Sequence, residues 1–338
     1  MKNNAVNNTN AVRTEQGNVE STQKNGVTQG YAELHDTRLY FERTGEGAPV
    51  VFLHAGIADH RMWDTQFHAF ADDYDVIRYD LRGYGKSNLG EGIDRERVTQ
   101  NGDPKDAKNF SHAQDLYLLL RTLGVEGATL IGASLGGATA IDFALEQPTM
   151  TNGLVLVGAV PSGYEYTGEM PPALQQFVES CQRGEMERAT ELATQLWFDG
   201  PQRQPAQMDA DLRAQVKSMI GDVFRSSMVD FTGENAAAKP AIQRLSEIDA
   251  PTLVIFGDQD EANVQRAANL LANEIPAAER VEMSGAAHLP NLEKPDEFYQ
   301  TVLDFLERIA TLDQEGDLAT GLGGAVKRKL VAPESVDR

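Results

Sequence analysis

The sequence is poor in cysteine and has no long apolar run. Its 338 residues contain a single cysteine, Cys181, so the chain cannot form an internal disulfide framework or a thiolate zinc cluster. Nothing in the sequence requires an oxidising compartment, and we expect a cytoplasmic protein. A membrane-spanning helix needs roughly 18 apolar residues, whereas the densest apolar run, at 154–160, is short and contains Gly158. We therefore expect a soluble protein with no membrane partner.

Basic side chains are also scarce. The chain has 30 Lys and Arg residues against 51 Asp and Glu residues, which gives a formal net charge of −21. An acidic field of this size repels phosphate backbones and anionic membrane surfaces, so nucleic acid is not an expected partner. The excess is typical of a soluble, self-repelling surface, and a specific cation-binding or high-salt adaptation is the alternative. The sequence leaves the oligomeric state open.

Short apolar runs alternate with helix-period segments after the first 30 residues. The runs predict buried parallel strands at 50–53, 76–79, 128–131, 154–157 and 252–256. Helices are predicted at 60–71, 111–123, 136–146, 262–275 and 296–309. Strands that alternate with helices indicate an α/β fold with a doubly wound, mostly parallel sheet.

Four other stretches fall outside this alternation. Residues 1–30 are rich in Asn, Thr, Gln and Gly, which predicts a disordered tail. Residues 161–240 are polar and rich in proline, with no convincing strand, and we expect a helical cap inserted into the core of 31–160 and 241–311. Residues 89–109 are predicted to form a long surface loop, and residues 312–338 a flexible C-terminal tail.

A serine stands between a predicted strand and a predicted helix, in the string Gly132-Ala133-Ser134-Leu135-Gly136. This position puts the serine on a sharp turn at the carboxyl edge of the sheet, with glycines on both sides to relieve crowding. The string lacks the Gly-x-Gly-x-x-Gly pattern and the Gly-Lys-Ser/Thr ending of phosphate-binding loops. No His, Cys and carboxylate cluster has metal-ligand spacing. We therefore expect neither a cofactor nor a metal.

Four segments together carry a resemblance to a known family. They are Leu53-His54-Ala55-Gly56, the stretch Asp80-Leu81-Arg82-Gly83-Tyr84-Gly85-Lys86-Ser87, the serine turn, and the pair Phe256-Gly257-Asp258-Gln259-Asp260 and Gly285-Ala286-Ala287-His288. In these segments and their order, residues 31–311 resemble the α/β-hydrolase family. The resemblance is to its small, capped bacterial members, which include esterases, enol-lactonases, carbon–carbon bond hydrolases and cofactor-free haloperoxidases.

The resemblance implies a set of catalytic residues. Ser134 is the expected nucleophile, and His288 is the base that it needs, because a serine hydroxyl is a poor nucleophile at neutral pH. Asp260 is the expected acid that orients the imidazole, since the family's acid typically stands three residues after the glycine that is here Gly257. Asp258 is the competing choice. The chain order of serine, acid and histidine agrees with that of the family.

The resemblance also implies an oxyanion hole formed by two backbone amides. These are the amide of Leu135, directly after the nucleophile, and that of Gly56 in the turn after the first strand. Ala55 stands where the family usually has its first glycine, so Ile57 is the alternative donor.

Three further features have a structural and a functional interpretation. We expect Asp80 and Arg82 to bind backbone groups and each other near the rim of the site, with no catalytic role. Trp63 and Trp197 are predicted to wall a substrate pocket beneath the cap, and core packing is an equal alternative.

The function that these features predict is hydrolysis of a small-molecule substrate, a carboxylic ester or lactone, through an acyl-enzyme on Ser134. A carbon–carbon bond hydrolase and a cofactor-free perhydrolase would use the same three residues. A ligand-binding signalling protein of the same fold, with slow or absent turnover, is the alternative from a different class.

Overall fold

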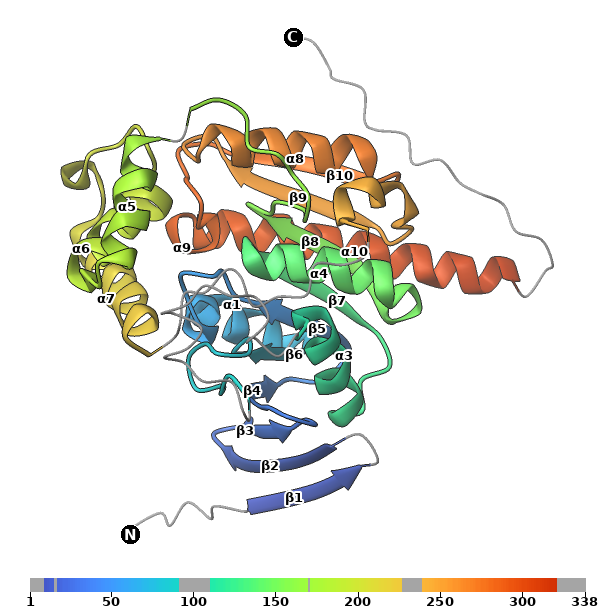
Figure 1. The fold of residues 1–338 in the computed structure, drawn as a ribbon. Helices are drawn as coiled ribbons and strands as arrows, with labels where there is room; N and C mark the ends of the chain where they lie inside the picture. The colour runs from blue at the N-terminus through green and yellow to red at the C-terminus, as the bar shows by residue number, and fades with distance from the viewer. Residues whose placement is uncertain (1–8, 15–16, 91–109, 170, 227–238, 321–338) are drawn as a thin grey trace.

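The strands of the structure, a computed structural model, form a single sheet. The structure describes residues 9–14, 17–90, 110–169, 171–226 and 239–320 (Figure 1). The sheet has ten strands in the order β1-β2-β3-β4-β6-β5-β7-β8-β9-β10. Their bounds are β1 Thr9–Thr14, β2 Gly17–Lys24, β3 Val27–Glu33, β4 Arg38–Thr44, β5 Ala48–Leu53, β6 Tyr74–Tyr79, β7 Ala128–Ala133, β8 Thr151–Val157, β9 Thr252–Gly257 and β10 Ala278–Met283.

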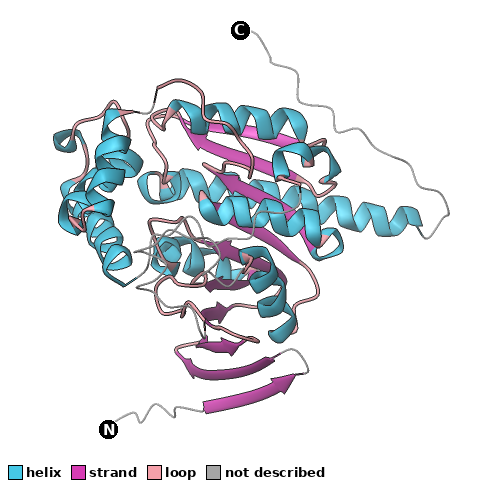
Figure 2. Ribbon diagram, viewed as in Figure 1, coloured by secondary structure: helices cyan, strands magenta, loops and turns pink. Residues whose placement is uncertain are grey.

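The six strands from β6 to β10 are parallel to one another. Every residue of β7 and of β9 is buried, as continuous apolar runs in a sheet covered on both faces require. Figure 2 shows helices on both sides of these strands. Helix α1 packs against α10, and α3 packs against α4. The predicted doubly wound, mostly parallel α/β fold is confirmed, and all five predicted strands are present.

The helices follow the predicted alternation closely. The α-helices are α1 Asp64–Ala69, α3 His112–Thr122, α4 Leu135–Glu146, α5 Pro172–Gln182, α6 Met186–Ala193, α7 Ala210–Ser226, α8 Ala262–Glu274, α9 Pro290–Glu293 and α10 Pro295–Thr320. Short 3₁₀ turns are η1 His60–Trp63, η2 Phe70–Asp72, η3 Pro148–Met150, η5 Pro205–Gln207, η6 Ala241–Gln243 and η7 Leu245–Glu247, and η4 Thr194–Asp199 is a π-helix. None of the helices in the described ranges is long and apolar enough to span a membrane.

The amino-terminal region differs from the disordered tail that we predicted. Strands β1, β2 and β3 extend the sheet as an antiparallel ribbon that leads into β4. A two-residue turn joins β2 to β3, and its residues Asn25 and Gly26 have φ angles of 52° and 80°. Asn-Gly with two positive φ angles is typical of tight hairpin turns that match the twist of the flanking strands. The polar composition of residues 1–30 therefore concealed a hairpin, because an edge ribbon buries little apolar surface.

The described part of residues 161–240 is helical and contains no strand. Helices α5, α6 and α7 form a separate group, and the arrowheads of β8 and β9 point toward it in Figure 1. The start and end of the insertion meet, since the amide of Ile242 donates to the carbonyl of Ser162 at 3.1 Å. Residues 227–238 and most of the predicted loop 89–109 lie outside the described residues. At the other end of the core, α10 continues to Thr320, beyond the predicted start of the C-terminal tail at 312.

Candidate active site

Ser134 occupies a strained turn between β7 and α4. Its φ of 51° and ψ of −112° lie in a region that residues other than glycine rarely adopt. Two backbone bonds hold the turn: the Ser134 amide donates to the carbonyl of Val157 at 2.8 Å, and the Ala138 amide donates to the carbonyl of Ser134 at 2.9 Å. The serine is half-buried, at the carboxyl edge of the sheet.

Close backbone approach explains the glycines around the serine. A Cβ on Gly132 would collide with the carbonyl oxygen of Gly136, and a Cβ on Gly136 would collide with that of Leu53. Helix α4 therefore starts directly against β7 and β5. This packing keeps the strained serine turn in place, because the turn cannot relax without separating the helix from the strands.

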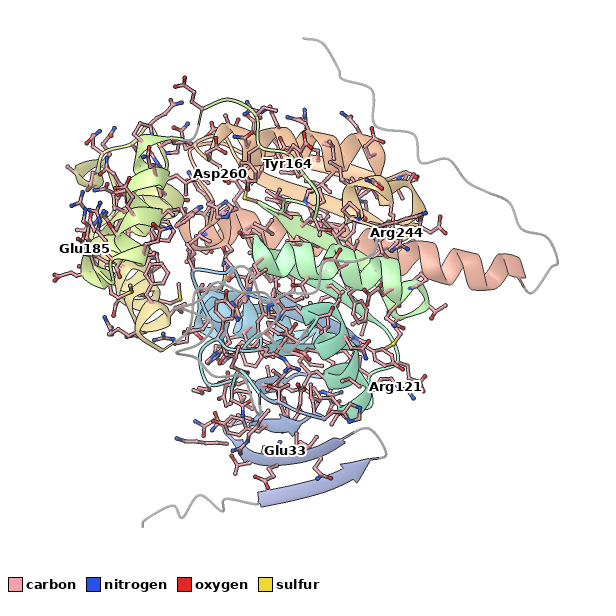
Figure 3. All side chains as sticks on the ribbon, in the orientation of Figure 1. Glu33, Arg121, Tyr164, Glu185, Arg244 and Asp260 are labelled. Atoms are coloured by element: carbon pink, nitrogen blue, oxygen red, sulfur yellow. The ribbon has the colours of Figure 1, made fainter. Side chains whose placement is uncertain are left out.

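His288 and Asp260 form a buried hydrogen-bonded pair. The Nδ1 atom of His288 lies 2.7 Å from Oδ2 of Asp260, and both side chains are almost fully enclosed. Asp260 follows β9 and is labelled in Figure 3, on the side of the sheet that faces the insertion. An ionised carboxylate only accepts hydrogen bonds, so Nδ1 carries the hydrogen. In the neutral ring, Nε2 therefore presents its lone pair.

Neighbouring carboxylates control the protonation of His288. Burial by itself lowers the pKa of the imidazole, but Asp260, with smaller contributions from Glu293 and Glu261, outweighs this effect and raises the pKa above its ordinary value. The carboxylates thus favour the charged form of the ring, the form that His288 takes when it has accepted a proton.

Of the two candidate acids, Asp260 is the one that bonds to His288. Asp258 instead holds the loop before the histidine: its Oδ1 accepts from the amide of Gly285 at 2.7 Å, and its Oδ2 accepts from the hydroxyl of Ser284 at 3.0 Å. Burial raises the pKa of Asp258, and hydrogen bonds from Gln259, Gly285 and Ser284 outweigh that effect and lower it. Asp258 therefore stabilises the loop before His288 instead of orienting the imidazole.

Gly158 links the serine to the histidine in space. It follows Val157, whose carbonyl binds the Ser134 amide, and it has a φ of 54°. A Cβ on Gly158 would lie 3.0 Å from Nδ1 and 3.1 Å from Cε1 of His288. The imidazole thus lies against the end of β8, beside the strand that carries Ser134. The sequence offered no sign of this role for Gly158.

The two predicted oxyanion-hole residues lie side by side. A Cβ on Gly56 would be 3.5 Å from the Cβ of Leu135 and 3.6 Å from the hydroxyl of Tyr84. Gly56 and Ile57 form the tip of a turn that closes where the Ala58 amide donates to the carbonyl of Ala55 at 2.9 Å. Leu135 is the first residue of α4, and an amide at that position has no partner within its helix. The positive end of the helix dipole adds to its attraction for an anion.

The two tryptophans have different surroundings. Trp63 is fully buried, and its ring packs against Phe52 with centroids 4.9 Å apart and against Phe298 at 6.0 Å. The predicted pocket role of Trp63 is therefore replaced by the packing alternative, because its ring fills the core under β5. Trp197 is half-buried in the insertion, where its ring meets Phe177 edge-on at 5.0 Å. Its contact with substrate stays a prediction.

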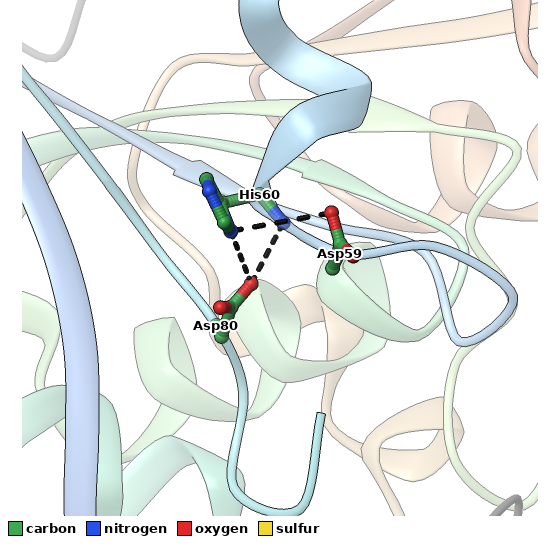
Figure 4. A group of neighbouring side chains, drawn as sticks. All are labelled: Asp59, His60 and Asp80. Atoms are coloured by element: carbon green, nitrogen blue, oxygen red, sulfur yellow. Dashed lines mark hydrogen bonds and ion pairs between the residues drawn. The ribbon is translucent and has the colours of Figure 1, made fainter. Parts of the chain in front are cut away.

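Asp80 and Arg82 do not bind each other as expected. Asp80 Oδ1 accepts from the backbone amide of His60 at 2.8 Å and lies 2.7 Å from its Nδ1, as Figure 4 shows. Arg82 instead forms a forked pair with Asp115, at 2.6 and 2.7 Å. His60 and Asp115 come within reach of Asp80 and Arg82 only after folding, so sequence spacing could not assign these partners.

Asp59, His60 and Asp80 bring potential metal-ligand atoms within 4.8 Å of one another. Their bonds are already made within the protein: Asp59 accepts from Arg61 at 2.7 to 3.1 Å, and the hydrogen on His60 Nδ1 points to Asp80. A ring nitrogen that donates to a carboxylate has no lone pair for a cation. The three side chains therefore stabilise the start of η1, which follows the Gly56 turn.

Several known proteins are similar to this chain in sequence. A sequence model described as the alpha/beta hydrolase fold matches residues 48–295. The chain is 26% identical over 296 residues to the 2-hydroxy-6-oxo-6-phenylhexa-2,4-dienoate hydrolase of Comamonas testosteroni, covering 82% of this chain and 93% of that protein. It is 28% identical over 282 residues to the pimeloyl-(acyl-carrier protein) methyl ester esterase of Yersinia pseudotuberculosis, covering 80% and 98%.

A solved structure extends the comparison. Est816, described as an N-acyl homoserine lactone degrading enzyme, superposes with a TM-score of 0.62 at 26% identity, covering 81% of this chain and 99% of that one. The chain therefore belongs to the alpha/beta hydrolase fold family. It is a hydrolase of that type, and the predicted resemblance is confirmed.

Proposed function

We propose that this protein is a serine hydrolase that cleaves a small carboxylic ester or lactone through an acyl-enzyme on Ser134. One observation carries the proposal: the buried His288–Asp260 pair lies against Gly158, next to the strand end that holds the strained Ser134 turn. A strained serine and an oriented imidazole at one sheet edge are the parts that nucleophilic acyl transfer needs.

The proposed reaction starts with attack of Ser134 Oγ on the substrate carbonyl carbon. His288 Nε2 takes the hydroxyl proton as the new C–O bond forms, and Asp260 stabilises the imidazolium through Nδ1–H. The carbonyl electron pair moves onto oxygen, where the amides of Leu135 and Gly56 bind it. When the tetrahedral intermediate collapses, the leaving alkoxide takes the proton from His288. Water then repeats the sequence and releases the acid.

The oxyanion donors supply a large share of the expected rate. Loss of one such donor typically costs about 3 kcal/mol in the transition state. The two hydrogen bonds between Asp80 and His60 hold the chain directly after the Gly56 turn. A turn held in this way needs little reorganisation when charge develops on the substrate, which is the basis of electrostatic preorganisation.

Carbon–carbon bond hydrolysis is a second candidate, favoured by the relative from Comamonas testosteroni. The relative from Yersinia pseudotuberculosis favours an ester, and Est816 favours a lactone. All three reactions use a carbonyl electrophile, so the same residues serve each. We place esters and lactones first because two of these three proteins act on them by name.

The test compares wild type with Ser134→Ala on a fluorophosphonate probe and on a panel of short p-nitrophenyl esters and lactones. Ser111→Ala is a matched control, since Ser111 caps α3 through the amide of Gln114 and takes no part in the reaction. We expect labelling and many turnovers in wild type and the control, and neither in Ser134→Ala. Labelling with no ester or lactone turnover would favour the carbon–carbon hydrolase or a slow ligand-binding protein. Turnover that survives in pure Ser134→Ala protein contradicts the mechanism.

A further inference from the structure

The π-helical segment η4 of the insertion contacts the loop that carries His288. The backbone amide of His288 donates to the carbonyl of Trp197 at 3.2 Å. Directly after η4, a Cβ on Gly200 would lie 2.5 Å from the carbonyl oxygen of Gln259 and 3.1 Å from the Cβ of Ala287. The insertion therefore reaches the backbone on both sides of the His288–Asp260 pair. π-helical turns are rare and often occur at functional sites.

Arg203 ties this segment to the core through one guanidinium. Its side chain donates to the carbonyls of Phe198 at 2.9 Å and Asp199, both at the end of η4. It also donates to the carbonyl of Gly285 at 2.7 Å and pairs with Glu293 at 2.6 Å. A planar guanidinium presents its donors in a fixed fork, so these four bonds set the position of η4 relative to the histidine loop.

Glu293 connects Arg203 to the residue before His288. Its Oε1 accepts from the amide of Ala287, the residue before His288, at 2.7 Å, and its other oxygen binds Arg203. The side chain is only 5% exposed. Burial raises the pKa of Glu293 above its ordinary value, and the Ala287 amide and the Arg203 cation offset only part of this effect. The insertion thus binds the His288 amide directly through Trp197, and it supports the Ala287 amide indirectly, through the pair that Arg203 forms with Glu293 of α9.

We propose that Arg203 and Glu293 are positioning residues that hold His288 in its working orientation by tying η4 to the backbone that carries the ring. This inference rests on the proposed function, because it assigns the orientation of the base in that reaction. Asp260 fixes the ring through its bond to Nδ1, whereas Arg203 and Glu293 fix the backbone that carries the ring. A shift of about 1 Å in a reacting group can cost roughly 100-fold in rate.

The first arm of the test measures kcat per active site, with sites counted by fluorophosphonate titration. Arg203→Gln removes the fork, and Arg183→Gln is the control, because Arg183 lies in the same insertion, where its side chain is 63% exposed and pairs with Glu179. We expect Arg203→Gln to lower kcat per titrated site by about 10- to 100-fold with a KM within about threefold of wild type. Arg183→Gln should match wild type.

Two results of this arm would overturn the proposal. One is fewer titratable sites in Arg203→Gln with an unchanged kcat per site, which is the behaviour of a purely structural residue. The other is full recovery in Arg203→Lys, because lysine keeps the pairing with Glu293 but cannot bind three carbonyls at once. We expect Arg203→Lys to fall between Arg203→Gln and wild type.

The second arm does not depend on any substrate. The NMR signal of the His288 Nδ1 hydrogen, which lies in the bond to Asp260, should shift in Arg203→Gln and keep its wild-type position in Arg183→Gln, because loss of the fork moves the backbone that carries the ring. A signal at the wild-type position in Arg203→Gln contradicts the proposal. If wild type turns over no ester or lactone, the proposed function fails while this arm still decides the positioning role.

Discussion

Two buried histidine–aspartate pairs stand out in the described part of the chain, and they have the same bond length. His288 lies 2.7 Å from Asp260, and His60 lies 2.7 Å from Asp80. Their surroundings differ. The Nε2 atom of His60 faces Glu42 Oε1 at 3.6 Å, in an ionic cluster, whereas the His288 ring lies against Gly158 at the edge that holds the serine. A buried histidine–aspartate pair is therefore not enough to define an active site. The surroundings of the imidazole that do not belong to the aspartate decide whether the pair is catalytic or structural.

Removal of the histidines should give the largest difference between the two pairs. His288→Gln removes the base, so we expect kcat to fall by about 10⁴- to 10⁶-fold while the fold is retained. His60→Gln leaves the buried carboxylate of Asp80 without its ring partner, so we expect a loss of about 2 to 4 kcal/mol in unfolding free energy and less than a tenfold loss of kcat per active site. Steady-state rates and urea unfolding measure the two effects. Equal losses of activity in both variants would contradict this assignment.

Replacement of the aspartates should also affect the two pairs differently, with a loss of rate at Asp260 and a loss of stability at Asp80. Asp260→Asn lets an amide donate to Nδ1, which favours the wrong tautomer, and we expect kcat to fall by about 10⁴-fold. Asp80→Asn keeps an acceptor for the His60 amide but loses the charge, so we expect mainly a loss of stability, about 3 kcal/mol. Rates and urea midpoints are again the measurements. A more severe loss of rate in Asp80→Asn than in Asp260→Asn is the contradicting result.

Gly158→Ala tests whether space beside the ring distinguishes the active pair. The new methyl group would lie 3.0 Å from Nδ1 of His288 and push the imidazole away from its position. We expect kcat to fall by about 10- to 100-fold and the unfolding free energy to fall by about 1 kcal/mol, because φ is positive there. A control is Gly124→Ala, which also has a positive φ but has no atom within 4 Å of the added carbon. Equal rates in both variants would contradict the packing argument.

The pH dependence gives a smaller but signed effect. His288 acts as a base only when neutral, and its pKa is raised, so kcat/KM should fall as pH drops through a midpoint above the ordinary histidine value of about 6.5. A raised pKa in the folded state also means that protonated His288 adds stability at low pH, and this contribution is lost as pH rises through the folded pKa. Urea midpoints of wild type and His288→Gln should therefore converge as pH rises. A midpoint of the acid limb below about 6.5 contradicts the assignment.

Asp258→Asn should have the smallest effect. An asparagine can still accept from Gly285 or Ser284, so the loop before His288 keeps part of its support. We expect kcat to change by less than about threefold, as measured beside Asp260→Asn. The reverse order of severity would reassign the acid to Asp258.

The parallel half of the sheet was predictable from sequence because its strands are buried on both faces and read as continuous apolar runs. The antiparallel ribbon was not, although Asn25-Gly26 between alternating residues is a strong hairpin signal that composition alone obscured. For the site, chain order and resemblance pointed to Ser134, Asp260 and His288. Periodicity could not tell whether Trp63 lines a pocket or fills the core, since both positions are apolar. The contacts of Arg203 and Gly158 exist only after folding, so no local pattern marks them.

The most direct test of the central claim is mass spectrometry of the protein after rapid acid quench during turnover of p-nitrophenyl acetate. We expect an acetyl group on the peptide that contains Ser134, formed at a rate equal to or faster than turnover and absent from Ser134→Ala and His288→Gln. Turnover with the acetyl group on another residue, or with none on Ser134 while Ser134→Ala stays active, would contradict the claim.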